Sequence, residues 1–367
     1  MSDSPSGGGG GALSFLSRFG FPFTQSIAIS SAPHRGAPTK PDEAGSYAGG
    51  KALDGFDGAD PTVAFGVQVG LTPRRLLAVL CYVYTVDFEA AAAEGFTLRP
   101  GGWCARIVLR DVALMLLYAG LWDWVLLHSP FAATARGWKY NKDAPSDEQT
   151  RRDVFWSTSS TLLSSAQEIA LILWWLQAWG PPPPFFAAEG EATLFSVLGV
   201  GVGVRTVLLL IWSATVKYWR LVHFYIIHRG MHPWWDRKNG LAQLDVGAFL
   251  YRHVHSLHHK SYNPTAWSGI SMHPLESTAY FSSALIPLAF ASGRHPYVHL
   301  LTKFDCAHGA MNGHDGHDGP VGNGGYFHQL HHAHFECNYG DNKVPLDWLF
   351  GTFDDGSTFT AKQAKAE

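Results

Sequence analysis

Two short stretches of this chain repeat one histidine spacing: residues 251–260 read YRHVHSLHHK, and residues 326–335 read YFHQLHHAHF. Upstream, a further histidine pair lies four residues apart. The three sets are His228 and His232; His255, His258 and His259; and His328, His331 and His332. Histidine is the commonest transition-metal ligand among side chains, and helical residues three or four apart share a face. Each set is therefore expected to point its rings in one direction. Together the sets offer eight imidazoles, too many for one metal ion but enough for two.

The region around these sets holds further candidates. Seventeen of the 19 histidines lie between His223 and His334, and the segment from His308 through His314 to His317 is able to supply more ligands. Metal-bound imidazoles usually donate their second nitrogen to a carboxylate or a carbonyl. Glu276 is a candidate for that role, and His273 is expected to support a ligand rather than to be one. His223 and His253 do not share a face with their sets; His223 is expected to be structural, and His253 to support a ligand or to lie on the surface.

Apolar segments predict helices before and between the sets. The candidates are Leu76–Val86, Val112–Leu127, Val154–Trp179, Leu194–Val216 and Thr278–Ala291. A membrane span needs about 20 apolar residues, so Leu194–Val216 qualifies, the segments before it do so marginally, and the last suits a half-buried helix. The first histidine pair is expected on a helix continuing from Leu194–Val216 and ending near His232, because Pro233 disfavours helical geometry there. Asp123, Glu168 and Arg205 are expected to pair with other helices.

Composition favours a membrane protein and excludes several other classes. The 367 residues are 46% hydrophobic and 16% charged, against about 25% charged in a typical soluble domain. The net charge of −3 and the lack of a basic face argue against nucleic acid as a partner. The four cysteines form no Cys-x-x-Cys pair, which excludes a zinc ribbon and predicts unpaired thiols.

The chain divides into a tail and one domain. Residues 1–62 are rich in Gly, Ser, Ala and Pro, so they are predicted to be disordered or to act as a targeting segment. Residues 63–367 are predicted to form the functional domain, with the histidine region at 220–352. The predicted fold is all-α: a polytopic membrane helical bundle carrying a histidine-rich cap.

The ligand chemistry favours a redox pair of metals. Imidazole suits zinc, copper, iron and nickel, whereas structural zinc needs only four ligands. Eight histidines on membrane-anchored helices therefore point to two metal ions that activate O2. No nucleotide-binding or haem-binding pattern is present in the sequence, so the electrons are expected to come from a separate partner.

These sets resemble the histidine boxes of the fatty acid hydroxylase/sterol desaturase superfamily. The resemblance covers roughly residues 194–356 and includes Asn263-Pro264, His273-Pro-Leu-Glu276, Asn338-Tyr339-Gly340, Asp347 and Phe350-Gly351-Thr352. It implies a cytosol-facing di-iron centre, O2 as co-substrate, and electrons from NAD(P)H through cytochrome b5 and its reductase or a similar carrier. Family members also carry a histidine about 20 residues before the third box. His308 matches that spacing and His314 matches the sequence context, so both remain candidate ligands, and Asn338 is a candidate supporting residue.

The resemblance implies a lipid substrate and an endoplasmic reticulum membrane, or a plastid membrane if the tail is a transit peptide. A sterol C5 desaturase or C4-methyl oxidase is the first hypothesis, and a fatty acyl or carotenoid hydroxylase is the second. A membrane metal transport or metal-binding protein is the alternative from another class, but the repeated His-x-x-His-His spacing favours an enzyme. A lapsed enzyme that only binds lipid is disfavoured because all eight box histidines are present.

Overall fold

The structure is a computed structural model that describes residues 46–47, 50–51, 85–136, 139–140, 144–197, 199–235, 241–317, 325–341 and 344–354. The predicted tail at 1–62 lies outside the described residues apart from two strands, β1 (Ser46–Tyr47) and β2 (Gly50–Lys51), which pair antiparallel. Most of the predicted helix at Leu76–Val86 also lies outside them. The prediction of a tail and one domain stays a prediction.

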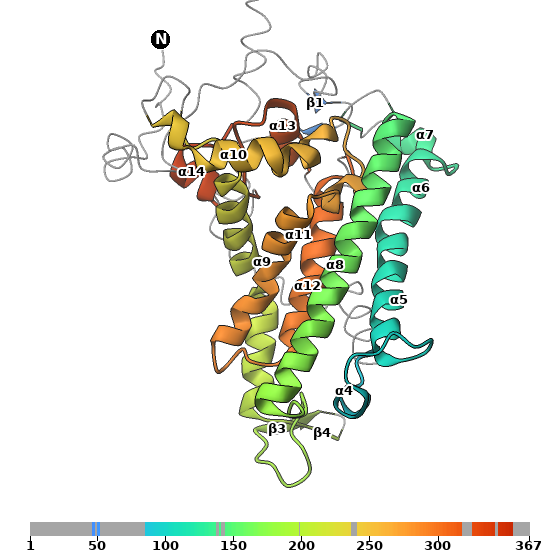
Figure 1. The fold of residues 1–367 in the computed structure, drawn as a ribbon, viewed down its shortest axis with the longest axis vertical. Helices are drawn as coiled ribbons and strands as arrows, with labels where there is room; N and C mark the ends of the chain where they lie inside the picture. The colour runs from blue at the N-terminus through green and yellow to red at the C-terminus, as the bar shows by residue number, and fades with distance from the viewer. Residues whose placement is uncertain are drawn as a thin grey trace, which may run out of the picture.

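Long helices form an upright bundle (Figure 1). Its N-terminal part consists of α4 (Phe88–Glu94), α5 (Trp103–Met115), the π-helix η1 (Leu116–Leu121), α6 (Trp122–Leu127), α7 (Ala132–Ala135) and α8 (Asp147–Trp179). Helix α8 starts where the Ser146 side chain accepts a hydrogen bond from the backbone of Gln149. It stops at Gly180, whose φ of 74° is rarely adopted by residues other than glycine. The predicted helices at Val112–Leu127 and Val154–Trp179 are both present.

The predicted continuous apolar helix at Leu194–Val216 is wrong before Val204, over its first ten residues. Strands β3 (Phe195–Val197) and β4 (Val200–Val202) form a hairpin there, and α9 (Val204–Gly230) begins only after Gly203. The sequence LGVGVGV explains the difference, because glycine disfavours a helix and Gly199 turns the hairpin with a φ of 81°. Helix α9 then ends at Gly230, close to the predicted end near His232.

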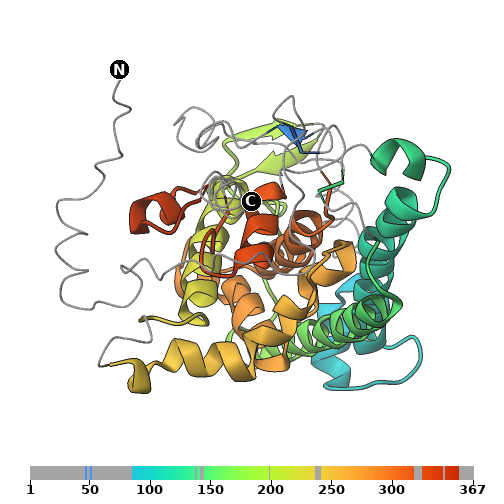
Figure 2. The ribbon, with the colours of Figure 1, turned by 90° about the horizontal axis from the view of Figure 1, so that it is seen from above.

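The rest of the chain forms the remaining bundle helices and the cap, which consists of the helices at residues 246–253 and 326–334. The elements are the 3-10 helix η3 (Ala242–Leu244), α10 (Val246–His253), the 3-10 helices η4 (His255–Lys260) and η5 (Ala266–Ile270), α11 (Pro274–Phe281), the 3-10 helix η6 (Ser282–Ala289), α12 (Pro296–Gly313), α13 (Tyr326–His334) and α14 (Leu346–Phe350). Helices α10 and α13 lie across one end of the bundle, opposite the β3–β4 hairpin (Figure 1), and α13 lies near the centre when the molecule is seen from that end (Figure 2). Most of the second part of the predicted Thr278–Ala291 helix is the 3-10 helix η6 rather than an α-helix.

The prediction of a mainly helical fold is confirmed. A core of buried residues from η1, η5, α11 and α12 lies directly beneath the cap and includes Trp267, Ile270 and Met311. Helix α12 approaches η5 so closely that a Cβ at Gly269 would lie 2.5 Å from the backbone of Ala310, so only glycine fits there. Within the described ranges, no helix has both the length and the apolar character required to traverse a bilayer.

Candidate metal centre

Nine histidines from distant parts of the chain gather in two buried groups beneath the cap. In each group the candidate ligand atoms all lie within 4.8 Å of one another. The first group is His228, His232, His255, His259 and His331, and the second is His258, His314, His328 and His332. Every member is at most 9% exposed. The three sets expected to converge therefore do so, and His314 joins them.

The expectation that each set points in one direction is wrong. The second and third sets each divide between the two groups: His258 leaves His255 and His259, and His331 leaves His328 and His332. The second set lies on the 3-10 helix η4 rather than on an α-helix. Both sets divide in the same way: the rings four residues apart, His255 with His259 and His328 with His332, stay in one group, and the middle ring joins the other group.

Backbone and carboxylate oxygens hold the outer nitrogens of five of these rings. Each of these oxygens accepts a hydrogen bond from a ring Nδ1, which fixes both the ring orientation and the tautomer. The pairs are His228 with the Tyr339 carbonyl at 2.5 Å, His255 with Glu276 Oε1 at 2.7 Å, His258 with the Ser271 carbonyl at 3.3 Å, His314 with the Ala310 carbonyl at 2.7 Å, and His331 with the Cys337 carbonyl at 2.6 Å. With the proton on Nδ1, a neutral ring presents the lone pair of Nε2 to the interior of its group.

Two pairs of inner nitrogens, those of His228 with His255 and of His258 with His314, then face one another without a proton between them. The Nε2 atoms of His228 and His255 are 2.9 Å apart, although both rings use their proton on the outer side. In the second group, His314 Nε2 lies 3.2 Å from His258 Nε2, 3.0 Å from His332 Nε2 and 2.9 Å from His328 Nε2. One imidazole nitrogen cannot make three hydrogen bonds.

A shared cation accounts for this arrangement. Metal–imidazole bonds of about 2.0–2.1 Å that meet at a right angle place their two nitrogens about 2.9 Å apart. The donor sets, five imidazoles and four imidazoles, therefore fit two transition-metal ions in both chemistry and spacing. Burial lowers the pKa of His258, His259 and His332 well below the ordinary value, and the neighbouring imidazoles lower it further. These rings are thus held neutral, which is the form that binds a metal.

The other predicted residues take different positions. Glu276 accepts from His255, as described above, which is the place predicted for it. His273 caps α11 by accepting from the Leu275 backbone at 3.2 Å. Asn338 accepts from the Asp354 backbone at 2.8 Å and donates to the Phe327 carbonyl at 3.2 Å, so it joins the start of α13 to the C-terminal loop.

His308 lies outside both groups, although its spacing made it a candidate ligand. Its ring packs against Tyr118 and Phe304, with ring centroids 4.4 and 5.4 Å away, and the Asn312 amide lies 3.0 Å from its Nδ1. The position reflects the helix itself: His308 is six residues before His314 on α12, so it sits more than a turn lower in the bundle.

Asp153 of α8 is a supporting residue that sequence reasoning missed. Its carboxylate is 1% exposed and accepts from the hydroxyls of Ser261 at 2.8 Å, Ser268 at 2.8 Å and Ser271 at 3.0 Å. The carbonyl of Ser271 is the acceptor for His258. More than 100 residues separate Asp153 from these serines, and no local pattern in α8 reveals the contact.

Comparison with known proteins identifies the region that builds this centre. Residues 207–352 match the model of the family described as fatty acid hydroxylase. This part of the chain is similar to the fatty acid hydroxylase family. The match contains all nine clustered histidines, so the resemblance inferred from the histidine boxes is confirmed. Asp153 lies outside the matched residues.

Curated proteins similar to this region include several that are named as sterol desaturases. A Delta(7)-sterol 5(6)-desaturase of Gibberella zeae is 31% identical over 28% of this chain and 30% of its own length. A Delta(7)-sterol-C5(6)-desaturase of Nicotiana tabacum is 31% identical over 31% of this chain and 44% of its own length. The chain spans less than half the length of the curated relatives that it matches. No solved structure matches it significantly.

Proposed function

We propose that the two histidine groups hold two iron ions and that the protein is an O2-dependent oxidoreductase acting on a lipid. The observation that carries this proposal is the convergence of three imidazole nitrogens on His314 Nε2 at 2.9–3.2 Å, which hydrogen bonding alone does not explain. Iron supplied with electrons from NAD(P)H through cytochrome b5 and its reductase, or a similar carrier, would provide the O2 chemistry that breaks an unactivated C–H bond.

The protein's own side chains prepare the site for this task. The Nδ1 protons are held by Tyr339, Glu276, Cys337, Ala310 and Ser271, so the Nε2 lone pairs are oriented before a metal arrives. Burial of all nine rings excludes bulk water, which would compete for the ligand positions. Preorganised ligands of this kind lower the cost of assembling the centre.

The names of the relatives support a sterol as the first substrate hypothesis, with C5 desaturation or C4-methyl oxidation as the reaction. A fatty acyl or carotenoid hydroxylase is the alternative, because hydroxylation and desaturation begin with the same removal of hydrogen. The position of the substrate relative to the metals decides between these outcomes.

We also propose that the bundle is embedded in a membrane, in the endoplasmic reticulum by family default and in a plastid if the tail is a transit peptide. Large apolar side chains on the outer surfaces of α5, α8 and α9 support this, and many of them are about half exposed. Examples are Leu109 at 66%, Phe155 at 61%, Trp174 at 49%, Ile211 at 54% and Ile226 at 55%. Water would not favour so much exposed apolar area, whereas lipid would.

The test is the metal content of the full-length protein purified in detergent after expression with ample iron. We expect about two irons per chain by elemental mass spectrometry, and a loss of iron in His258→Ala and His331→Ala. His253→Ala is the matched control, because this histidine lies on α10 outside both groups. Iron near zero in folded protein would refute the proposal, and stoichiometric zinc or copper in its place would favour a metal-binding or transport protein. Lipid extracts from expressing cells would then be screened for new hydroxyl groups or double bonds.

A further inference from the structure

Two of the nine clustered rings lack the outer hydrogen bond that holds five of the others. The Nδ1 atoms of His259 and His332 are buried, and neither has a hydrogen-bond partner within the described part of the chain. The two side chains are 2% and 0% exposed. Each ring is the last histidine of its His-x-x-His-His set, so the same position in both sets lacks an outer partner.

The missing partner matters when a ring binds a metal through Nε2. A neutral imidazole carries one proton, so a ring bound through Nε2 carries that proton on Nδ1. For His255 and His258 the proton then meets an oxygen, at 2.7 and 3.3 Å. For His259 and His332 it would be buried without an acceptor, which is costly. Outer partners contribute about 10–100-fold to metal affinity, so these two rings should bind more weakly than their neighbours.

The inner nitrogens of the same two rings do have partners when no metal is bound. His259 Nε2 lies 3.2 Å from His232 Nε2 and 3.1 Å from His331 Nε2, and His332 Nε2 lies 3.0 Å from His314 Nε2. His331 and His314 donate from Nδ1 to carbonyls, so their inner nitrogens are able to accept a hydrogen bond. Binding a metal therefore costs His259 and His332 a hydrogen bond that Nδ1 does not replace.

The two rings lie next to each other where the groups meet. His259 belongs to the five-histidine group and His332 to the four-histidine group, yet their ring centroids are only 5.0 Å apart. Among the described rings no other pair joins the groups so closely, since the next distances are 5.3 and 5.5 Å. Phe335 packs edge to face against His259 at 4.6 Å, and an aromatic ring is at best a weak acceptor.

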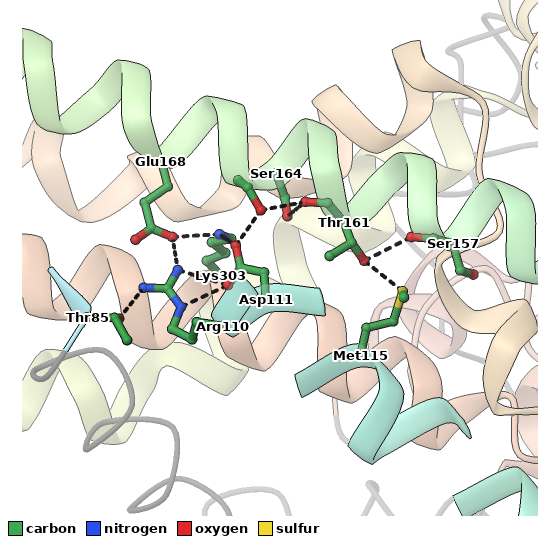
Figure 3. Close-up of polar contacts among 10 residues, drawn as sticks. Thr85, Arg110, Asp111, Met115, Ser157, Thr161, Ser164, Glu168 and Lys303 are labelled. Atoms are coloured by element: carbon green, nitrogen blue, oxygen red, sulfur yellow. Dashed lines mark hydrogen bonds and ion pairs between the residues drawn. The ribbon is translucent and has the colours of Figure 1, made fainter. Parts of the chain in front are cut away.

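The bundle, by contrast, fixes the helix that ends at His314. Lys303 of α12 donates to Glu168 of α8 at 2.6 Å and also to Asp111 of α5 (Figure 3). Arg110 joins the same two carboxylates, at 2.8 Å from Asp111 and 2.5 Å from Glu168. Moving α12 away from α5 and α8 would leave buried charges without their partners, which is strongly destabilising. His314, at the C-terminal cap of α12, is therefore part of a rigid frame.

We propose that His259 and His332 are the exchangeable ligands of the two metals. Each binds last and leaves first, while the five rings with an outer partner stay in place. Their departure opens one coordination position on each metal at the junction of the groups, where O2 or another small ligand can enter. This inference rests on the proposed function, because it takes the two groups to be metal sites.

The first test is iron titration of the full-length protein in detergent, followed by elemental analysis. His259→Ala is compared with His331→Ala in the five-histidine group, and His332→Ala with His258→Ala in the four-histidine group. We expect the first variant of each pair to bind iron at least about tenfold more tightly than the second, and to hold two irons at saturating iron. Equal losses of affinity within either pair would overturn the proposal.

The second test needs no substitution. The ring proton on Cε1 of each histidine exchanges with deuterium at a rate that mass spectrometry resolves residue by residue, and a metal bound to the ring slows this exchange. In the unaltered, iron-loaded protein, His259 and His332 should exchange at least about tenfold faster than His255, His258 and His331. Equal rates would overturn the proposal. Iron content separates the two failures: iron near zero refutes the proposed function, whereas two irons with equally protected rings refute only this inference.

Discussion

Replacing Asp153 by Asn should weaken one metal site more than the other. The Asp153 carboxylate accepts three serine hydroxyls, including that of Ser271, whose carbonyl in turn fixes His258. An amide of the same shape accepts at one oxygen only, so either Ser268, which donates to Oδ2, or Ser261 and Ser271, which donate to Oδ1, lose their acceptor. A hydrogen bond to a charged group contributes about 1.5–3 kcal/mol, so losing one such bond places the cost in that range.

The consequence should appear at the four-histidine group, because the Asp153 serines support His258 and no described contact joins them to His228 or His232. Loss of a supporting partner typically lowers metal affinity about 10–100-fold, and a partner one step further away should lie at the lower end. We expect Asp153→Asn to bind two irons at saturating iron and close to one when iron is limiting. The assay is iron titration of purified protein followed by elemental analysis.

Asp147→Asn is the matched control, since Asp147 lies on the same helix and is exposed. It should titrate like the unchanged protein. Equal loss of both irons in Asp153→Asn, or no loss at any iron concentration, would refute the reasoning from the serine contacts.

Other predictions follow from single contacts. Glu276→Gln should lower iron affinity about 10–100-fold at the five-histidine group, because an amide holds the Nδ1 proton of His255 less firmly; unchanged titration would contradict this. Gly269→Ala should destabilise the protein by about 1–3 kcal/mol through the clash with Ala310, whereas Gly313→Ala, which meets no atom within 4 Å, should not; thermal melting distinguishes them. Burial lowers the pKa of His317 to about 4, so between pH 6.5 and 4 the unfolded chain binds a proton that the folded chain does not. The free energy of unfolding should therefore decrease as the pH is lowered across that window, by up to about 3 kcal/mol from this group. His317→Asn should make the melting temperature depend less on pH, and an unchanged pH dependence would count against the buried neutral ring.

The sequence predicted the histidine sets and most helices because both depend on local spacing. The apolar runs of α8 and of α5 through α6 predict helices, and helices are found there. Pro233 predicts that α9 ends near His232, and the helix ends two residues earlier, at Gly230. The division of each His-x-x-His-His set between two groups was not predictable, since it depends on how η4 and α13 pack against the other elements that carry histidines. The choice of His314 over His308 depends on where α12 ends relative to the cap. The Asp153 contacts depend on packing between elements more than 100 residues apart.

The division of the second and third sets has a consequence for assembly. Segments η4 and α13 each carry rings for both groups, so neither group can form without placing three rings of the other. The two metal positions are then thermodynamically linked. The first ion bears most of the cost of ordering the rings that no Nδ1 hydrogen bond holds, such as His259 and His332, and the second ion binds more tightly than it would alone. Loading should thus be cooperative, with few singly occupied molecules in the unaltered protein.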